Sequence, residues 1–109
     1  MYHGTTPMLL LEVDADLTGK TIQVAFRSVT GEVFMKAAPD VAVYPDNDGS
    51  IITVTFTQAE TFQIPEGVCQ VEVRWVDEDE IADISFIGSV DVIGSITKNV
   101  ISYKGGSNA

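Results

Sequence analysis

Apolar and polar residues alternate along most of this chain with a period of two. The alternation is clearest over residues 20–28, 51–57 and 68–77. In the first of these stretches Ile22, Val24 and Phe26 fall on one face, and mainly polar residues fall on the other. Successive side chains of a strand point to opposite faces of a sheet, so the pattern predicts strands with one buried and one solvated face.

Further strands are predicted where the same period recurs more weakly. They cover residues 8–14, 32–37 and 82–93, with a short edge strand around residues 41–44 that Pro45 ends. In the last long strand we expect Ile84, Phe86, Val90 and Val92 to point inward. Gly88 interrupts their row, which predicts a bulge or a bend at this position.

The predicted strands are separated by turn residues that recur about every 10–18 positions. Thr57 and Glu60 have the spacing of a capping box and predict one helical turn over residues 57–62. Six or seven short strands in a chain of this size predict an all-β, immunoglobulin-like, two-sheet antiparallel sandwich. A small β-barrel is the alternative fold.

The chain is expected to form a single domain, because 109 residues hardly allow two. The expected sandwich spans residues 1–104, with an N-terminal arm over residues 1–7 and a C-terminal segment over residues 95–104. Residues 105–109 are predicted to be a flexible tail. The C-terminal segment fits two conformations, a helix with one apolar face and an extended segment with weak alternation.

The balance of charge limits the partners. Sixteen Asp and Glu residues against six Lys and Arg residues give a formal net charge of −10. We therefore expect neither nucleic acid nor an anionic membrane surface as a partner, because both require clustered Lys and Arg. Residues 1–7 carry no Lys or Arg, and the apolar run that follows ends at Glu12. We expect neither a signal peptide nor a membrane span.

Few residues are suited to catalysis. The chain has one histidine, His3, and one cysteine, Cys69. We expect His3 to be exposed near the terminus, and Cys69, inside an alternating strand, to be a buried apolar side chain. A zinc site requires several such ligands, and the sequence contains neither a nucleophile motif nor a phosphate-binding loop. We therefore expect no catalytic residue, no cofactor and no enzymatic activity.

Oxygen ligands for calcium are more plentiful. The turn at residues 46–50 begins like a calcium loop, but Thr57 stands where the pattern requires a glutamate. The acidic run at residues 77–80 is typical of a solvated hairpin tip. No metal site is expected, and the alternative calcium ligands are Asp46, Asp48, Asp77, Asp79 and Asp83.

Aromatic side chains are the second alternative, because they can form a platform for carbohydrate. The position of Trp75 in the alternation matches that of Val71, which places Trp75 in the predicted core. Tyr2, Tyr44 and Tyr103 lie at ends and edges and are the surface candidates. A small carbohydrate- or calcium-binding β module is therefore the alternative function.

The beginning of the chain carries a recognisable motif. It reads Met1-Tyr2-His3-Gly4-Thr5-Thr6-Pro7, followed by an alternating strand, the turn Asp16-Leu17-Thr18-Gly19 and a second strand. Residues 57–61, after a threonine-rich strand, and residues 71–75 continue the pattern. With these elements the chain resembles small proteins encoded by phages and prophages of Gram-positive bacteria. Gly4-Thr5-Thr6-Pro7 is the sharpest part of the resemblance.

The resemblance implies a noncatalytic structural or protein-interaction module of the phage tail or baseplate region. Its partners would be other phage structural proteins or further copies of the chain, in the virion or in the host cytoplasm during assembly. The acidic run at 77–80 and the segment 95–103 depart from the family pattern. Residues 1–7 either order on docking or lead directly into the first strand. The interface candidates are Tyr2, Thr5, Thr6, Pro7, Ile96, Val100 and Tyr103.

Overall fold

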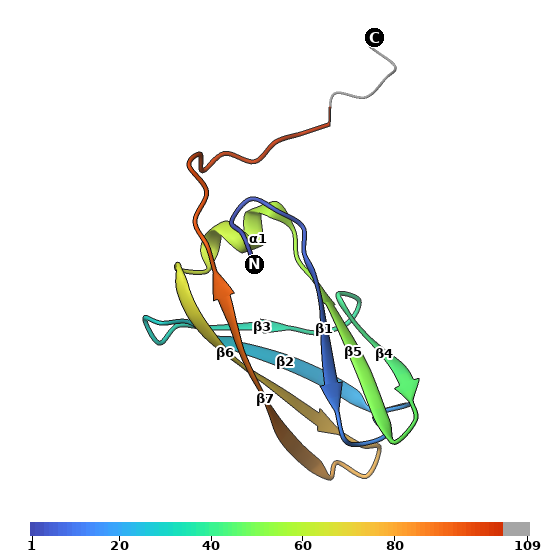
Figure 1. Cartoon of the computed structure of the whole chain (residues 1–109). Helices are drawn as coiled ribbons and strands as arrows, with labels where there is room; N and C mark the ends of the chain where they lie inside the picture. Colours follow the sequence, from blue (N-terminus) through green and yellow to red (C-terminus); the bar gives the residue numbers. More distant parts are fainter. Residues whose placement is uncertain (104–109) are drawn as a thin grey trace.

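The chain folds into two antiparallel β-sheets that pack face to face (Figure 1). The computed structural model describes residues 1–103. One sheet has the order β1-β5-β4, with β1 at Met8–Val13, β5 at Gly49–Thr55 and β4 at Val41–Asp46. The other has the order β3-β2-β6-β7, with β3 at Val33–Lys36, β2 at Thr21–Arg27, β6 at Gly67–Val76 and β7 at Ala82–Val92. The predicted all-β sandwich is confirmed, and within the described residues the sheets do not close into a barrel.

The order of the strands is that of an immunoglobulin-like fold. If the strands are equated in chain order with B, C, C′, D, E, F and G, one sheet is B-E-D and the other is C′-C-F-G. Strand A of the immunoglobulin-like fold, which would lie beside β1, has no equivalent among residues 1–103. Tyr2 instead forms a single parallel bridge with Ile93, at the end of β7. The outer edge of β1 therefore has no neighbouring strand in the described part of the chain.

The core lies between the two sheets and follows the predicted alternation. Its fully buried side chains include Val24, Phe26, Ile52, Val54 and Val73. The ring of Phe26 packs edge-on against Phe56, with the ring centroids 5.3 Å apart. Cys69 is buried as predicted, and Trp75 packs partly buried at the margin of the core.

Strand β7 departs from the sequence pattern. Its pairing with β6 shifts at a bulge that leaves Ile87 without a partner and gives Gly88 a φ of +144°. The irregularity predicted at Gly88 is thus confirmed. One inserted residue reverses the face that the neighbouring side chains occupy, so Ile84 and Phe86 are 52% and 66% exposed. The prediction that these two point inward is wrong, whereas Val92, on the other side of the bulge, is buried.

The one helix of the described residues, α1 at Gln58–Gln63, begins at the predicted capping box. The Thr57 hydroxyl accepts a hydrogen bond from the backbone N–H of Glu60 at 3.1 Å. The Glu60 carboxylate in turn accepts one from the backbone N–H of Thr57 at 2.8 Å. No helix within residues 1–103 is long and apolar enough to cross a membrane.

After β7 the chain leaves the sandwich near α1 and runs away from it (Figure 1). Residues 94–103 contain neither a helix nor a strand. The helical alternative for the C-terminal segment is therefore wrong over these residues. Lys104 and the tail predicted at residues 105–109 lie outside the described residues.

Candidate interaction surfaces

Residues 1–7 lie against the sandwich and do not form a free arm. The side chain of His3 is buried, contrary to the prediction, and its Nε2 donates to the carbonyl oxygen of Ile64 at 2.5 Å. The backbone N–H of His3 donates to Ile93 at the end of β7. The hydrogen bonds and a tilted contact with the Phe62 ring offset the cost of burying the imidazole. The sequence leaves open whether residues 1–7 order on docking or lead directly into the first strand. In the structure they lead directly into β1.

Gly4 occupies a position that favours glycine. Its φ is +77°, in the left-handed region that glycine adopts without strain. Its N–H donates to the hydroxyl of Thr61 at 2.8 Å, and a Cβ at this position would lie 2.8 Å from Cζ of Phe62. Residues 4–7 and 57–61, two parts of the sequence that carry the phage resemblance, therefore meet in the fold.

The interface candidates of the N-terminal segment are held at the surface. Tyr2, Thr5 and Thr6 are exposed, and Pro7 is half-buried. The Thr5 hydroxyl donates to the backbone carbonyl of Tyr2 at 2.7 Å. These side chains face solvent from a fixed position beside α1.

The C-terminal candidates lie on a segment with few contacts to the sandwich. Its exposed apolar side chains are Ile96, Val100, Ile101 and Tyr103. Lys98 Nζ lies 3.3 Å from Nδ1 of His3 and 3.7 Å from the Glu66 carboxylate. The C-terminal segment therefore begins beside the N-terminal one.

One side chain of α1 holds the far part of this segment. The amide Nε2 of Gln58 donates to the carbonyl oxygen of Ile101, and its Oε1 accepts from the N–H of the same residue, both at 2.8 Å. No other hydrogen bond within the described residues reaches residues 99–103. The apolar side chains of the segment are thus left to solvent while its backbone is held at one point.

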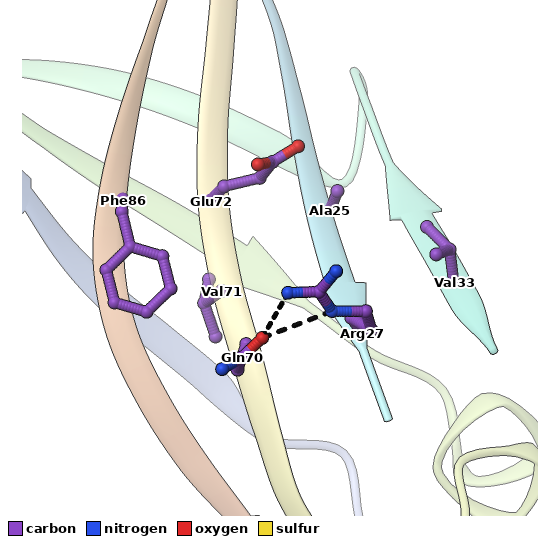
Figure 2. Close-up of a pocket in the computed structure, with 7 residues that line it drawn as sticks. All are labelled: Ala25, Arg27, Val33, Gln70, Val71, Glu72 and Phe86. Carbon is purple, nitrogen blue, oxygen red and sulfur yellow. Dashed lines mark hydrogen bonds between the residues drawn. The ribbon is translucent and has the colours of Figure 1, made fainter. Parts of the chain in front are cut away.

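A second apolar area lies on the outer face of the four-stranded sheet (Figure 2). Its exposed side chains are Val33, Met35, Ile84 and Phe86. Between them Arg27 donates from both Nε and Nη2 to Oε1 of Gln70. A shallow hollow of about 100 Å³ lies between Phe86, Glu72 and Arg27. The surface combines apolar margins with a polar centre.

A third surface is the open side of the sandwich between β1 and β7. A groove of about 260 Å³ runs there, lined mainly by Leu9, Leu10, Leu11, Ile87 and Val90. Met8 and Leu10, on the outer face of β1, are 60% and 64% exposed. An apolar edge and an apolar groove therefore adjoin each other.

Lys36 is a buried cation that ties β3 to α1. Its Nζ lies 2.6 Å from the Glu60 carboxylate and 3.0 Å from that of Asp40, and 5.0 Å from the centre of the Phe56 ring. Burial acts to lower the pKa of the Lys36 ammonium, but the hydrogen bonds and charges of Glu60 and Asp40 raise it above its usual value. The ion pairs of Lys36 with Glu60 and Asp40 thus compensate the buried charge and stabilise the fold.

The calcium candidates lie on two hairpins and at the start of a strand. Asp46 and Asp48 belong to the β4–β5 hairpin, and Asp83 lies near the start of β7. Oδ1 of Asp77 accepts from the N–H groups of Asp79 and Ile81, at 2.9 and 3.0 Å, and so closes the β6–β7 turn. Within residues 1–103 no three acidic, His or Cys side chains lie close enough together to hold a metal ion.

The remaining candidates are spread over the molecule. Tyr2 lies in the N-terminal segment, Tyr44 on β4 and Tyr103 on the C-terminal segment. Burial raises the pKa of the Cys69 thiol, as expected of a thiol in an apolar core.

Sequence reasoning missed Leu10 and Gln58. A signal for Leu10 exists, because Met8-Leu9-Leu10-Leu11 is apolar on both faces of a strand that should have one polar face. No signal links Gln58 to Ile101, since 43 residues separate them. Comparisons with protein-family models and with curated proteins find no match to this chain.

Proposed function

We propose that the chain is a noncatalytic structural or protein-interaction module of the tail or baseplate region of a phage. The observation that carries the proposal is the C-terminal segment, whose apolar side chains are exposed outside the sandwich. Apolar side chains gathered in this way mark sites of contact with another protein. A neighbouring protein binds by covering the apolar side chains of this segment.

The phage setting is supported by the resemblance of the N-terminal motif. Gly4 bonds to Thr61, so two recognisable parts of that motif depend on each other for their conformation. A chain that shares both parts is expected to share the docking of residues 1–7 onto α1. The proposed partners are phage structural proteins or further copies of this chain, met in the virion or in the host cytoplasm during assembly.

The charge of the chain supports a protein partner. With a net charge of −10 and six Lys and Arg residues, it lacks the clustered cations that bind phosphate backbones. One of the cations, Lys36, is buried in its own ion pairs. The surface is therefore expected to recognise a partner mainly through apolar contacts.

A binding assay with purified tail and baseplate proteins from the phage or prophage that encodes the chain tests this role. The variant Tyr103→Asp places a charge on the C-terminal segment and is expected to weaken binding at least about tenfold. Tyr44→Asp is the matched control, because Tyr44 is 54% exposed but lies on β4. A chain that remains monomeric and binds no tail component would contradict the proposal. A response to glycans or calcium instead would favour the alternative of a small binding module.

A further inference from the structure

Of the four strands at sheet edges, β1 is the least protected against pairing with another chain. β4 ends in Pro45-Asp46, β3 has four residues, and β7 carries the bulge at Gly88. β1 has four apolar residues in succession, with neither a proline nor a bulge. A flat apolar edge of this kind readily accepts a further strand.

The free edge of β1 presents backbone groups that are ready to pair. On its other side, toward β5, the Pro7 carbonyl accepts from the N–H of Phe56 at 3.2 Å. Bonded pairs alternate along an antiparallel ladder, so the N–H and C=O groups of Met8, Leu10 and Glu12 point away from β5. Within residues 1–103 no backbone group pairs with them.

The C-terminal segment presents backbone groups of the matching kind. Gln58 both donates to and accepts from Ile101, and a facing residue in an antiparallel strand makes the same two bonds. The Gln58 side chain thus occupies the place beside Ile101 that a neighbouring strand can take. The ten residues 94–103 span roughly 33 Å when extended and β1 spans roughly 20 Å, at about 3.3 Å per residue. The segment is long enough to leave its own sandwich and cover a β1 strand.

We propose that residues 97–103 of one copy pair antiparallel with β1 of a second copy, with Ile101 opposite Leu10. This inference rests on the proposed function as an interaction module and names its partner. Both strands contribute apolar side chains, and the added strand takes the place beside β1 that strand A has in an immunoglobulin-like fold. If the exchange is mutual, two copies form a closed dimer with two identical contacts.

The backbone groups allow Ile101 to lie opposite Met8, Leu10 or Glu12, and the register with Leu10 is the one that also matches the side chains. It brings Tyr103 opposite Met8, Val100 opposite Leu11 and Asn99 opposite Glu12. Because Leu11 faces the core, Val100 then points into the apolar groove between β1 and β7. Lys98 arrives opposite Val13, on the same face as Val100. The added strand therefore meets apolar side chains along most of its length.

The partner is a second copy because the chain's own segment runs in the wrong direction. β1 and β7 point in opposite directions, and the segment leaves the upper end of β7 (Figure 1). To pair antiparallel with its own β1, it would have to reverse direction twice and still provide a strand. Residues 94–103 are too few for this.

Cross-linking between two variants that each carry one added cysteine tests the register. We expect the mixture of Leu10→Cys and Ile101→Cys chains to form a disulfide dimer under mild oxidation, with the peptides around positions 10 and 101 joined in the mass spectrum. The native Cys69 is fully buried and serves as the common background. Val33→Cys mixed with Ile101→Cys is the matched control, since Val33 is 57% exposed at the edge of the other sheet, and it is expected to give no dimer.

Sedimentation velocity of two further variants measures the same contact without added cysteines. Leu10→Lys, at an exposed position, is expected to weaken self-association at least about tenfold because a charge opposes pairing at the edge. Gln58→Ala removes the competing bonds to Ile101 and is expected to strengthen self-association about fivefold. Circular dichroism of both variants is expected to match that of the native chain.

Four outcomes would overturn the inference. A disulfide between positions 10 and 101 that forms only when both cysteines are on one chain would show pairing within the chain. A dimer that cross-links through Val33→Cys would place the contact on the other sheet, and a monomer that binds a tail protein would leave the proposed function standing without self-pairing. A chain that neither self-associates nor binds a tail protein would contradict the proposed function as well.

Discussion

The backbone N–H of Gly4 donates a hydrogen bond to the hydroxyl of Thr61, which lies 2.8 Å away and 57 positions later in the chain. Thr61 is fully buried, and its hydroxyl donates in turn to the backbone carbonyl of Gln58 at 2.8 Å. Gln58 also holds Ile101. Helix α1 therefore connects the N-terminal and the C-terminal segments of the molecule.

Replacing Gly4 with alanine is predicted to destabilise the protein more than replacing Gly19. The two residues have φ of +77° and +76°, so each substitution costs about 1–2 kcal/mol of left-handed strain. A Cβ at Gly4 meets the Phe62 ring at 2.8 Å, whereas nothing lies within 4 Å of one at Gly19. Urea unfolding is expected to show an extra loss of at least about 1 kcal/mol for Gly4→Ala. Equal losses would argue against the close packing on Phe62.

Stability toward acid is predicted to depend on the ion pair between Lys36 and Glu60. The hydrogen bond from Lys36 lowers the pKa of Glu60 below its ordinary value of 4.5. The stabilisation is therefore complete above the unfolded-state pKa and is lost as the pH falls through the lower pKa of the folded state. Glu60→Gln keeps a side chain suited to the capping box and removes this titration.

Urea unfolding from neutral pH down to about pH 3 compares the two proteins. The difference in free energy of unfolding between the native chain and Glu60→Gln should shrink as the pH falls below 4.5. A difference that stays constant over this range would mean that the ion pair with Lys36 contributes nothing to the acid response.

The bulge in β7 predicts unequal effects at two phenylalanines. Phe26 is fully buried and Phe86 is 66% exposed. Phe26→Ala is expected to cost about 3–5 kcal/mol of unfolding free energy, and Phe86→Ser less than about 0.5 kcal/mol. Thermal and urea unfolding of both variants measure the difference. A large loss of unfolding free energy for Phe86→Ser would indicate that Phe86 points inward, as strict alternation predicts.

Calcium is predicted to leave the melting temperature unchanged. Oδ1 of Asp77, in the most acidic turn, is engaged by the N–H groups of Asp79 and Ile81, so binding a cation there would break turn bonds. A thermal-shift titration with calcium, with magnesium as the control, measures this. A stabilisation that grows with calcium and is lost in Asp77→Asn would support the alternative function.

Features that depend on local chemistry could be predicted from the sequence. Alternation places Val24 and Phe26 in the core because the period of a strand is a property of the backbone. The capping box at Thr57 and Glu60 needs only a spacing of three residues. The exposed apolar side chains of the C-terminal segment also follow from its position beyond the last strand.

Features that depend on distant contacts could not be predicted. Alternation reverses at Ile87, so a correctly placed bulge still led to the wrong face for Phe86. His3 has few neighbours in sequence to predict its burial, because its partner, Ile64, comes 61 positions later. The exposed interface candidates could therefore be predicted from the sequence. The free edge of β1 could be identified only from the order of the strands in the sheet.

The most direct test of an interaction role is the mass of the 109-residue chain in solution, measured by sedimentation over a wide range of concentrations. We expect a mass that rises with concentration from that of one 11.7 kDa chain toward that of two, and a return to one chain in Ile101→Asp. A mass of one chain at every concentration, both alone and in mixtures with purified tail and baseplate proteins, would contradict an interaction role.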